Sequence, residues 1–83
     1  MTTAINTAAV ADINSRAYIA TKVDRFNRAT SDRLQLDCLW RIASAADLYP
    51  AAILNRTEED GITPTMRAEI LEWLQTAGFT VSL

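Results

Sequence analysis

Histidine is absent from this 83-residue sequence, and cysteine occurs once, as Cys38. Without histidine the chain lacks the commonest general base and metal ligand. A single cysteine also excludes an intrachain disulfide and a cysteine-pair zinc site. Cys38 is expected to be a small core residue, because no histidine or second cysteine is present to activate it. The sequence therefore predicts a protein that is not an enzyme and has no catalytic, metal or cofactor site.

Glycine and proline are scarce, with two residues of each in the chain. Two glycines are too few for a glycine-rich phosphate loop. No apolar run approaches the roughly 18 residues of a membrane span, and the first residues lack the pattern of a signal peptide. We therefore expect no membrane association and no export.

The stretch from Ala4 to Leu48 contains neither glycine nor proline. Its apolar residues recur every three or four positions, which predicts a long amphipathic helix. Such a helix would extend about 65 Å at ~1.5 Å per residue, more than the remaining residues can cover. Residues 29–32 include side chains that can cap a new helix, so a break there is the alternative. In either case we expect other copies or another protein to cover this segment.

The helix is expected to end at Tyr49-Pro50, because proline cannot continue helical hydrogen bonding and disfavours the α conformation before it. Residues 51–55 are a short apolar run that we interpret as a strand. Residues 56–61 are polar and contain a glycine, which predicts a loop.

The clearest helix signal lies near the C-terminus. Thr63 is a suitable N-cap, Pro64 suits the first helical position, and Gly78 suits the residue after the helix, so we predict a helix over 64–77. Residues 79–83 then alternate apolar and polar side chains, which is typical of a half-buried strand.

These elements predict an α+β fold that is mostly α. Residues 1–49 would form a long helical segment for assembly, and residues 50–83 a compact strand–helix–strand unit with parallel strands. A two-stranded sheet is marginal alone, so we expect its edges to pair with neighbouring subunits. The alternative is a small independent domain with a solvated edge strand.

The charge balance argues against general nucleic-acid binding. Ten acidic and eight basic residues leave a net charge of −2, which does not favour a sequence-independent grip on phosphates. The most basic stretch contains Lys22, Arg25, Arg28, Arg33 and Arg41, but aspartates lie among them. Nucleic-acid binding is therefore a minor hypothesis.

The predicted long helix ends with the segment Ile42-Ala43-Ser44-Ala45-Ala46, and the later run from Glu69 to Ser82 reads EILEWLQTAGFTVS. Through these segments, over roughly residues 40–83, the sequence resembles small structural proteins of tailed bacteriophages. The resemblance implies a non-catalytic virion part present in many copies, such as a capsid decoration, neck or tail component. It implies location in the virion; without it, the cytoplasm is expected.

Three functions remain open. The first is a structural protein that forms homo-oligomers or packs with other virion proteins; the second is a small regulatory or inhibitor protein that docks a helix face onto a host protein. The third is helical nucleic-acid binding. The residues predicted to form the interface are apolar or aromatic and lie on the long helix or in the C-terminal unit: Ile13, Ile19, Val23, Phe26, Leu34, Trp40, Ile42, Trp73, Phe79 and Val81.

Overall fold

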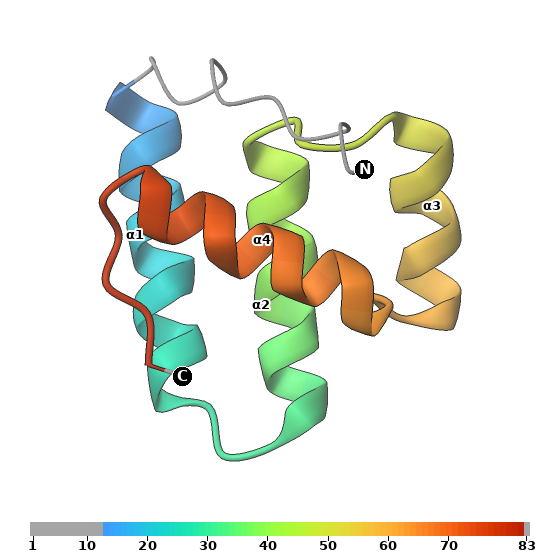
Figure 1. Cartoon of the computed structure of the whole chain (residues 1–83), viewed down its shortest axis with the longest axis horizontal. Coiled ribbons are helices and arrows are strands. Elements are labelled where there is room, and N and C mark those ends of the chain that lie inside the picture. The colour runs from blue at the N-terminus through green and yellow to red at the C-terminus, as the bar shows by residue number, and fades with distance from the viewer. Residues whose placement is uncertain (1–12, 83) are drawn as a thin grey trace.

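The computed structural model describes residues 13–82, including the side chains of 15–57 and 61–82. These residues form four helices: α1 (Ile13–Arg28), α2 (Asp32–Ala45), α3 (Ala51–Asp60) and α4 (Pro64–Thr76). Helices α1 and α2 run antiparallel, α4 crosses one face of this pair, and α3 lies on the other side of α2 from α1 (Figure 1). No strand occurs between residues 13 and 82, so the predicted α+β class is wrong and this part of the chain is all-helical.

The long helix is divided in two, at the place given by the alternative prediction. Helix α1 ends at Arg28 and α2 starts at Asp32. Ser31 is the N-cap of α2, with an extended backbone and a side-chain oxygen that accepts a hydrogen bond from the Leu34 amide at 3.3 Å. This cap satisfies an amide that would otherwise lack a helical partner. The chain thus folds back at residues 29–31, and the described part measures 29 × 29 × 22 Å instead of forming a ~65 Å rod. Residues 4–12 of the predicted helix lie outside the described residues.

Helix α2 ends earlier than predicted, at Ala45 rather than beside Pro50. Asp47 has a positive φ of 55°, and the amides of Asp47 and Leu48 donate to the carbonyls of Ser44 and Ala43 at 3.2 and 3.0 Å. This pattern closes a helix with one left-handed residue, a position that glycine usually occupies and aspartate tolerates. The sequence signal was therefore weak.

Residues 51–60 form helix α3, so the predicted strand at 51–55 and the predicted loop at 56–61 are wrong. Pro50 has an extended backbone, and its carbonyl accepts hydrogen bonds from the amides of Ile53 and Leu54 at 3.0 and 3.1 Å. Proline is well suited to a helix start because its missing amide is not needed there. A short apolar run fits a helix as well as a strand, and the alanines and leucine after Pro50 have high helix propensity.

Helix α4 confirms the prediction for 64–77 to within one residue. The Thr63 hydroxyl accepts a hydrogen bond from the Met66 amide at 3.1 Å, and Pro64 occupies the first turn. At the other end Gly78 has a φ of 97°, and the amides of Gly78 and Phe79 donate to Gln75 and Leu74 carbonyls. These are the two hydrogen bonds of a Schellman cap.

The segment after α4 turns back along α1 without forming a strand (Figure 1). The side-chain nitrogen of Asn27, Nδ2, donates to the Thr80 carbonyl at 3.0 Å. The backbone amide of Ser82 donates to the Asn27 side-chain oxygen at 2.8 Å. Phe79 and Val81 pack against the core. The alternating pattern thus correctly indicated a half-buried segment. The predicted strand at 79–83 is nevertheless wrong for residues 79–82, which form no strand. Leu83 lies outside the described residues.

One apolar core joins the helices. Its fully buried side chains include Ile19 and Phe26 of α1, Leu39 and Ile42 of α2, and Ile70 and Leu74 of α4. Leu54 of α3 is also buried, and the Trp40 indole nitrogen donates to its carbonyl at 2.8 Å. The residues before and after Pro50, which the sequence assigns to two units, therefore share one core within 13–82.

Candidate functional site

Half of the predicted interface residues are buried inside the chain's own core. These are Ile19, Val23, Phe26, Ile42 and Trp73, none of which exposes more than 4% of its surface. They form the contacts of α1, α2 and α4 with one another. The helical spacing of these residues reflects packing within one molecule.

The other predicted interface residues are distributed differently. Trp40, Phe79 and Val81 are partly buried against the core, whereas Leu34 exposes 55% of its surface. Ile13 begins α1, and its side chain lies outside the described part of the chain. Of the predicted residues, Leu34 is thus the one that the structure makes available for a new contact.

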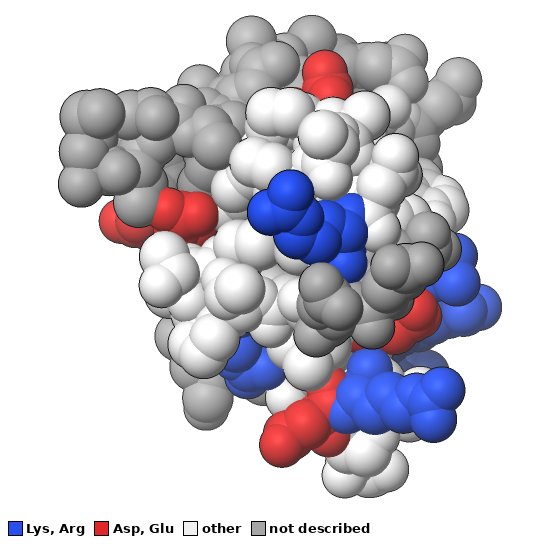
Figure 2. Space-filling model, turned by 90° about the vertical axis from the view of Figure 1, so that its right-hand side faces the viewer, with Lys and Arg blue, Asp and Glu red and all other residues white. Residues whose placement is uncertain are grey.

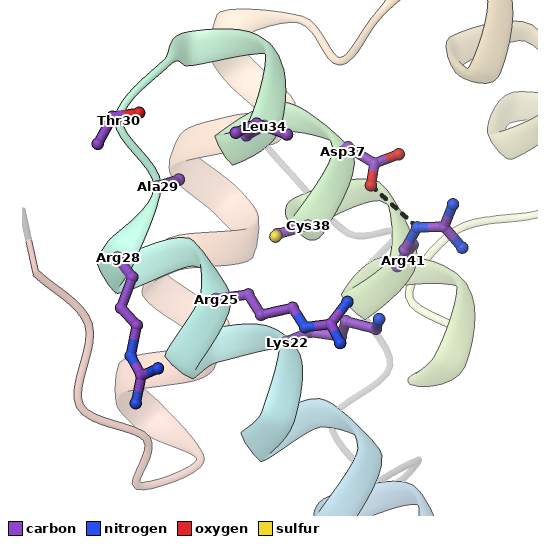
Figure 3. A pocket seen from close by; sticks show the side chains of 9 residues that line it. All are labelled: Lys22, Arg25, Arg28, Ala29, Thr30, Leu34, Asp37, Cys38 and Arg41. Carbon is purple, nitrogen blue, oxygen red and sulfur yellow. Dashed lines mark hydrogen bonds and ion pairs between the residues drawn. The ribbon is translucent and has the colours of Figure 1, made fainter.

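Leu34 lies at the edge of an open groove between the end of α1 and the start of α2. The groove has a volume of about 600 Å³. Figure 3 shows its lining side chains, which come from α1, the connection and α2: Lys22, Arg25, Arg28, Ala29, Thr30, Leu34, Asp37, Cys38 and Arg41. We call this feature the α1–α2 groove.

Helical periodicity explains how these residues come together. Lys22, Arg25 and Ala29 follow one another at steps of three and four along α1 and just beyond it, so they share one side of the helix. Leu34, Cys38 and Arg41 do the same along α2. The turn at 29–31 makes the two helices antiparallel, and the two stripes therefore face a common space (Figure 3).

The groove is strongly positive for a chain of net negative charge. Four cationic side chains and one carboxylate, that of Asp37, line it, so the lining carries +3 while the whole chain carries −2. A concave surface with one dominant sign of charge concentrates the field and attracts ligands of opposite sign.

Three of the four cations have weak partners on their own helix. Arg28 pairs with Asp24 at 3.1 Å, and Arg41 pairs with Asp37 at 3.0 Å, in both cases one helical turn apart and largely exposed. Asp37 raises the pKa of Arg41 through this hydrogen bond. Lys22 lies over the Tyr18 ring at 5.1 Å. Exposed pairs of this kind contribute little to stability because water screens them, so they yield readily to a competing anion.

Cys38 forms the uncharged floor of the groove. Burial raises the pKa of its thiol, the nearby Asp37 carboxylate raises it further, and the cations Lys22, Arg25 and Arg41 act in the opposite direction. The residue is 7% exposed. A neutral, buried thiol is a poor nucleophile, so the environment of Cys38 suits a packing role.

Other exposed features of the surface are dispersed. Figure 2 shows the side of the molecule at the right of Figure 1, where basic and acidic side chains alternate and the largest basic group lies at the lower right. Tyr18 and Ile53 are 42% and 38% exposed, from α1 and α3 respectively. At the groove, an exposed large apolar side chain and several cations line one hollow.

Within the described residues, no group of three or more histidine, cysteine, aspartate or glutamate residues is arranged to hold a metal ion. No helix in this part of the chain is both long enough and apolar enough to cross a membrane. All buried side-chain nitrogen and oxygen atoms that are described have a hydrogen-bond partner.

The groove is partly visible in the sequence. Lys22, Arg25, Arg28 and Arg41 belong to its most basic stretch, but the aspartates among them dilute the positive charge of that stretch. In the fold Asp37 lies in the groove and Asp24 stays paired with the groove residue Arg28 at 3.1 Å, whereas Asp32 is not among the lining residues. The contribution of Ala29, Thr30 and Cys38 required knowledge of the helix reversal.

Comparison of the chain with protein-family models, curated proteins and solved structures finds no match.

Proposed function

We propose that this chain is a non-enzymatic protein-interaction module that docks onto another protein through the α1–α2 groove. The observation that carries the proposal is the presence of a half-exposed leucine and four cations around one open hollow. Apolar contact supplies affinity, and charge supplies orientation and rate of association. This corresponds to the docking hypothesis derived from the sequence, with a different set of contact residues.

The burial of predicted interface residues on α1 also supports this choice. Ile19, Val23 and Phe26 already pack within the chain, so they are not free to recruit other copies. Helices α1, α2 and α4 give the groove a rigid support, which lowers the entropic cost of ordering a binding surface.

The proposal can be tested with an unbiased random-peptide selection against the full chain. Selected peptides are then titrated into the isotope-labelled protein, and amide shifts are mapped by NMR. We expect the largest shifts within residues 22–41, and we expect Leu34→Ser to reduce binding of those peptides. Failure to select any peptide, or shifts confined to α3 or α4, would count against a docking role for the groove.

A second candidate is a structural subunit that packs with other subunits in a larger assembly, such as a phage virion. It is supported by the separate exposure of Leu34 in the first turn of α2 and of Ile53 in the first turn of α3. These turns lie at opposite ends of the molecule in Figure 1, and two distinct contact points are what head-to-tail assembly needs.

Sedimentation at high protein concentration should then show species larger than dimers, and Ile53→Lys should abolish them. A purely monomeric or dimeric distribution would exclude this candidate.

A further inference from the structure

We infer that the α1–α2 groove binds an acidic protein segment that carries an apolar side chain between its carboxylates. This inference rests on the proposed docking function and specifies the chemistry of the partner. It follows from three properties of the groove: its charge, the state of its cations, and its apolar edge.

The first property is charge complementarity. The lining carries +3, although the chain as a whole carries −2. An acidic segment is therefore attracted to the groove and repelled, on average, by the rest of the molecule. This difference favours one docking position over others and increases the association rate at low salt.

The second property is the availability of Arg25. Its side chain is exposed and has no ion pair or hydrogen bond with any described residue. In Figure 3 it extends from α1 beside Lys22, across the space between the two helices. A guanidinium group binds a carboxylate through two parallel hydrogen bonds, so Arg25 provides the principal free position for a partner glutamate or aspartate. The exposed pairs of Arg28 and Arg41 can rearrange to provide others.

The third property is the apolar edge. Leu34 is 55% exposed beside Ala29 and the buried Cys38 thiol. An apolar side chain of the partner would cover Leu34 and remove apolar surface from water, with a gain of about 25 cal/mol per Å² buried. A charged ligand without an apolar side chain would leave Leu34 exposed to water.

The same properties disfavour nucleic acid as the occupant. No aromatic ring lies among the lining residues, so the groove lacks the stacking surface that single-stranded nucleic acids use. Asp37 within the lining and the net negative charge of the chain repel a phosphate backbone. A protein segment can place its carboxylates so as to avoid Asp37, whereas a regular phosphate chain cannot.

The test uses a fluorescein-labelled helical peptide of roughly twelve residues, or about three turns, with glutamates on one face around one leucine. Anisotropy titrations with the full chain compare it with a glutamine version, a version in which serine replaces the leucine, and a single-stranded oligonucleotide of similar length. We expect the glutamate peptide to bind best, and raising NaCl from about 50 to about 500 mM to weaken it strongly.

Arg25→Glu is the diagnostic variant, and Arg33→Glu is its matched control. Both arginines are exposed, and Arg33 lies on α2 outside the groove lining. We expect Arg25→Glu to weaken binding by about tenfold or more, and Arg33→Glu by less than about twofold. Unchanged circular dichroism of both variants would establish that they fold.

The inference is overturned if the glutamine peptide, the serine peptide or the oligonucleotide binds as tightly as the glutamate peptide, or if both charge reversals have equal effects. Its failure is distinguishable from failure of the docking function. If randomly selected peptides bind residues 22–41 but are neutral or basic, the groove docks proteins of another chemistry. If no selected peptide binds there, the docking function itself is lost.

Discussion

Leu34 and Leu39 lie five residues apart on α2, yet the first is 55% exposed and the second is completely buried. Sequence periodicity alone did not separate them, because both fit an apolar pattern on a helix whose leucines and tryptophan cover most of its circumference. The positions of α1, α4 and the chain reversal determine which leucine is buried. As a result, Leu39 packs in the core and Leu34 lines the groove.

This difference predicts opposite outcomes for two matched substitutions. Leu39→Ala should lower the free energy of unfolding by about 2–5 kcal/mol, because it leaves a cavity in a closely packed core. Leu34→Ala should change it by less than about 0.5 kcal/mol, as expected for an exposed position. Urea unfolding followed by circular dichroism measures both values. Equal effects would mean that Leu34 is covered in solution.

Tyr49 gives the protein a specific response to alkaline pH. Its hydroxyl donates to a Glu69 carboxylate oxygen at 2.6 Å, and burial, followed by this hydrogen bond, raises the Tyr49 pKa well above its ordinary value of about 10. The folded state therefore retains the proton longer than the unfolded state does. The stabilisation is complete below about pH 10 and is lost as the pH rises above that value, because the unfolded chain then binds fewer protons.

Tyr49→Phe should lower the free energy of unfolding at neutral pH by about 1–2 kcal/mol through loss of a hydrogen bond to a charged acceptor. It should also reduce the loss of stability above about pH 10, where one such group contributes up to about 1.4 kcal/mol per pH unit. Part of the alkaline loss should remain, because the Cys38 pKa is raised as well. Tyr18→Phe, at an exposed site, is the control. The interpretation fails if the two variants have the same pH profile in urea unfolding.

At the level of helices, local signals were readable where the chain carries its own cap. Thr63, Pro64 and Gly78 fixed both ends of α4, and Ser31 marked a possible start for α2, because caps act within a few residues of sequence. The start of α3 at Pro50 was missed, since the apolar run after a proline has no periodicity to distinguish helix from strand. The strand predicted at 79–83 rested on alternation alone, and residues 79–82 keep that half-buried pattern without forming a strand.

Just after the end of α2, Asp47 occupies a backbone position that suits glycine better than aspartate. Its φ of 55° lies in the left-handed region, where a side chain costs energy, and the residue is exposed. Asp47→Gly should raise the free energy of unfolding by about 0.5 kcal/mol, and Asp47→Val should lower it by about 1–2 kcal/mol. Thermal unfolding of both variants and the parent provides the comparison. A glycine variant that is clearly less stable would contradict the left-handed cap.

At the level of the whole molecule, the sequence suggested too much apolar helix for one small protein to cover. That prediction assumed a straight rod, whereas the reversal at residues 29–31 places α1 and α2 against each other and against α4. The apolar residues of α1 and α2 could be identified from the sequence, but their distance from other parts of the same chain could not. Only tertiary structure supplies that distance.

Because the fold buries most of the predicted interface residues of α1 and α2 in its own core, the protein should not require a partner for stability. We expect the unfolding midpoint of the full chain to stay constant over about a hundredfold range of protein concentration, whereas an obligate oligomer becomes more stable as concentration rises. Denaturation curves followed by tryptophan fluorescence should coincide with those from circular dichroism, because Trp40 and Trp73 belong to the same packed body. A midpoint that rises with concentration would restore the requirement for self-association.

The single thiol of the molecule provides a direct measure of groove occupancy. Cys38 is the only cysteine in the sequence, and its sulfur faces the groove from the floor (Figure 3). An alkylating reagent therefore modifies at most one site per chain, slowly, because the thiol is buried and largely protonated. A bound segment that covers Leu34 and Arg25 should slow alkylation further in proportion to saturation, so mass spectrometry of the unmutated protein can count occupied molecules.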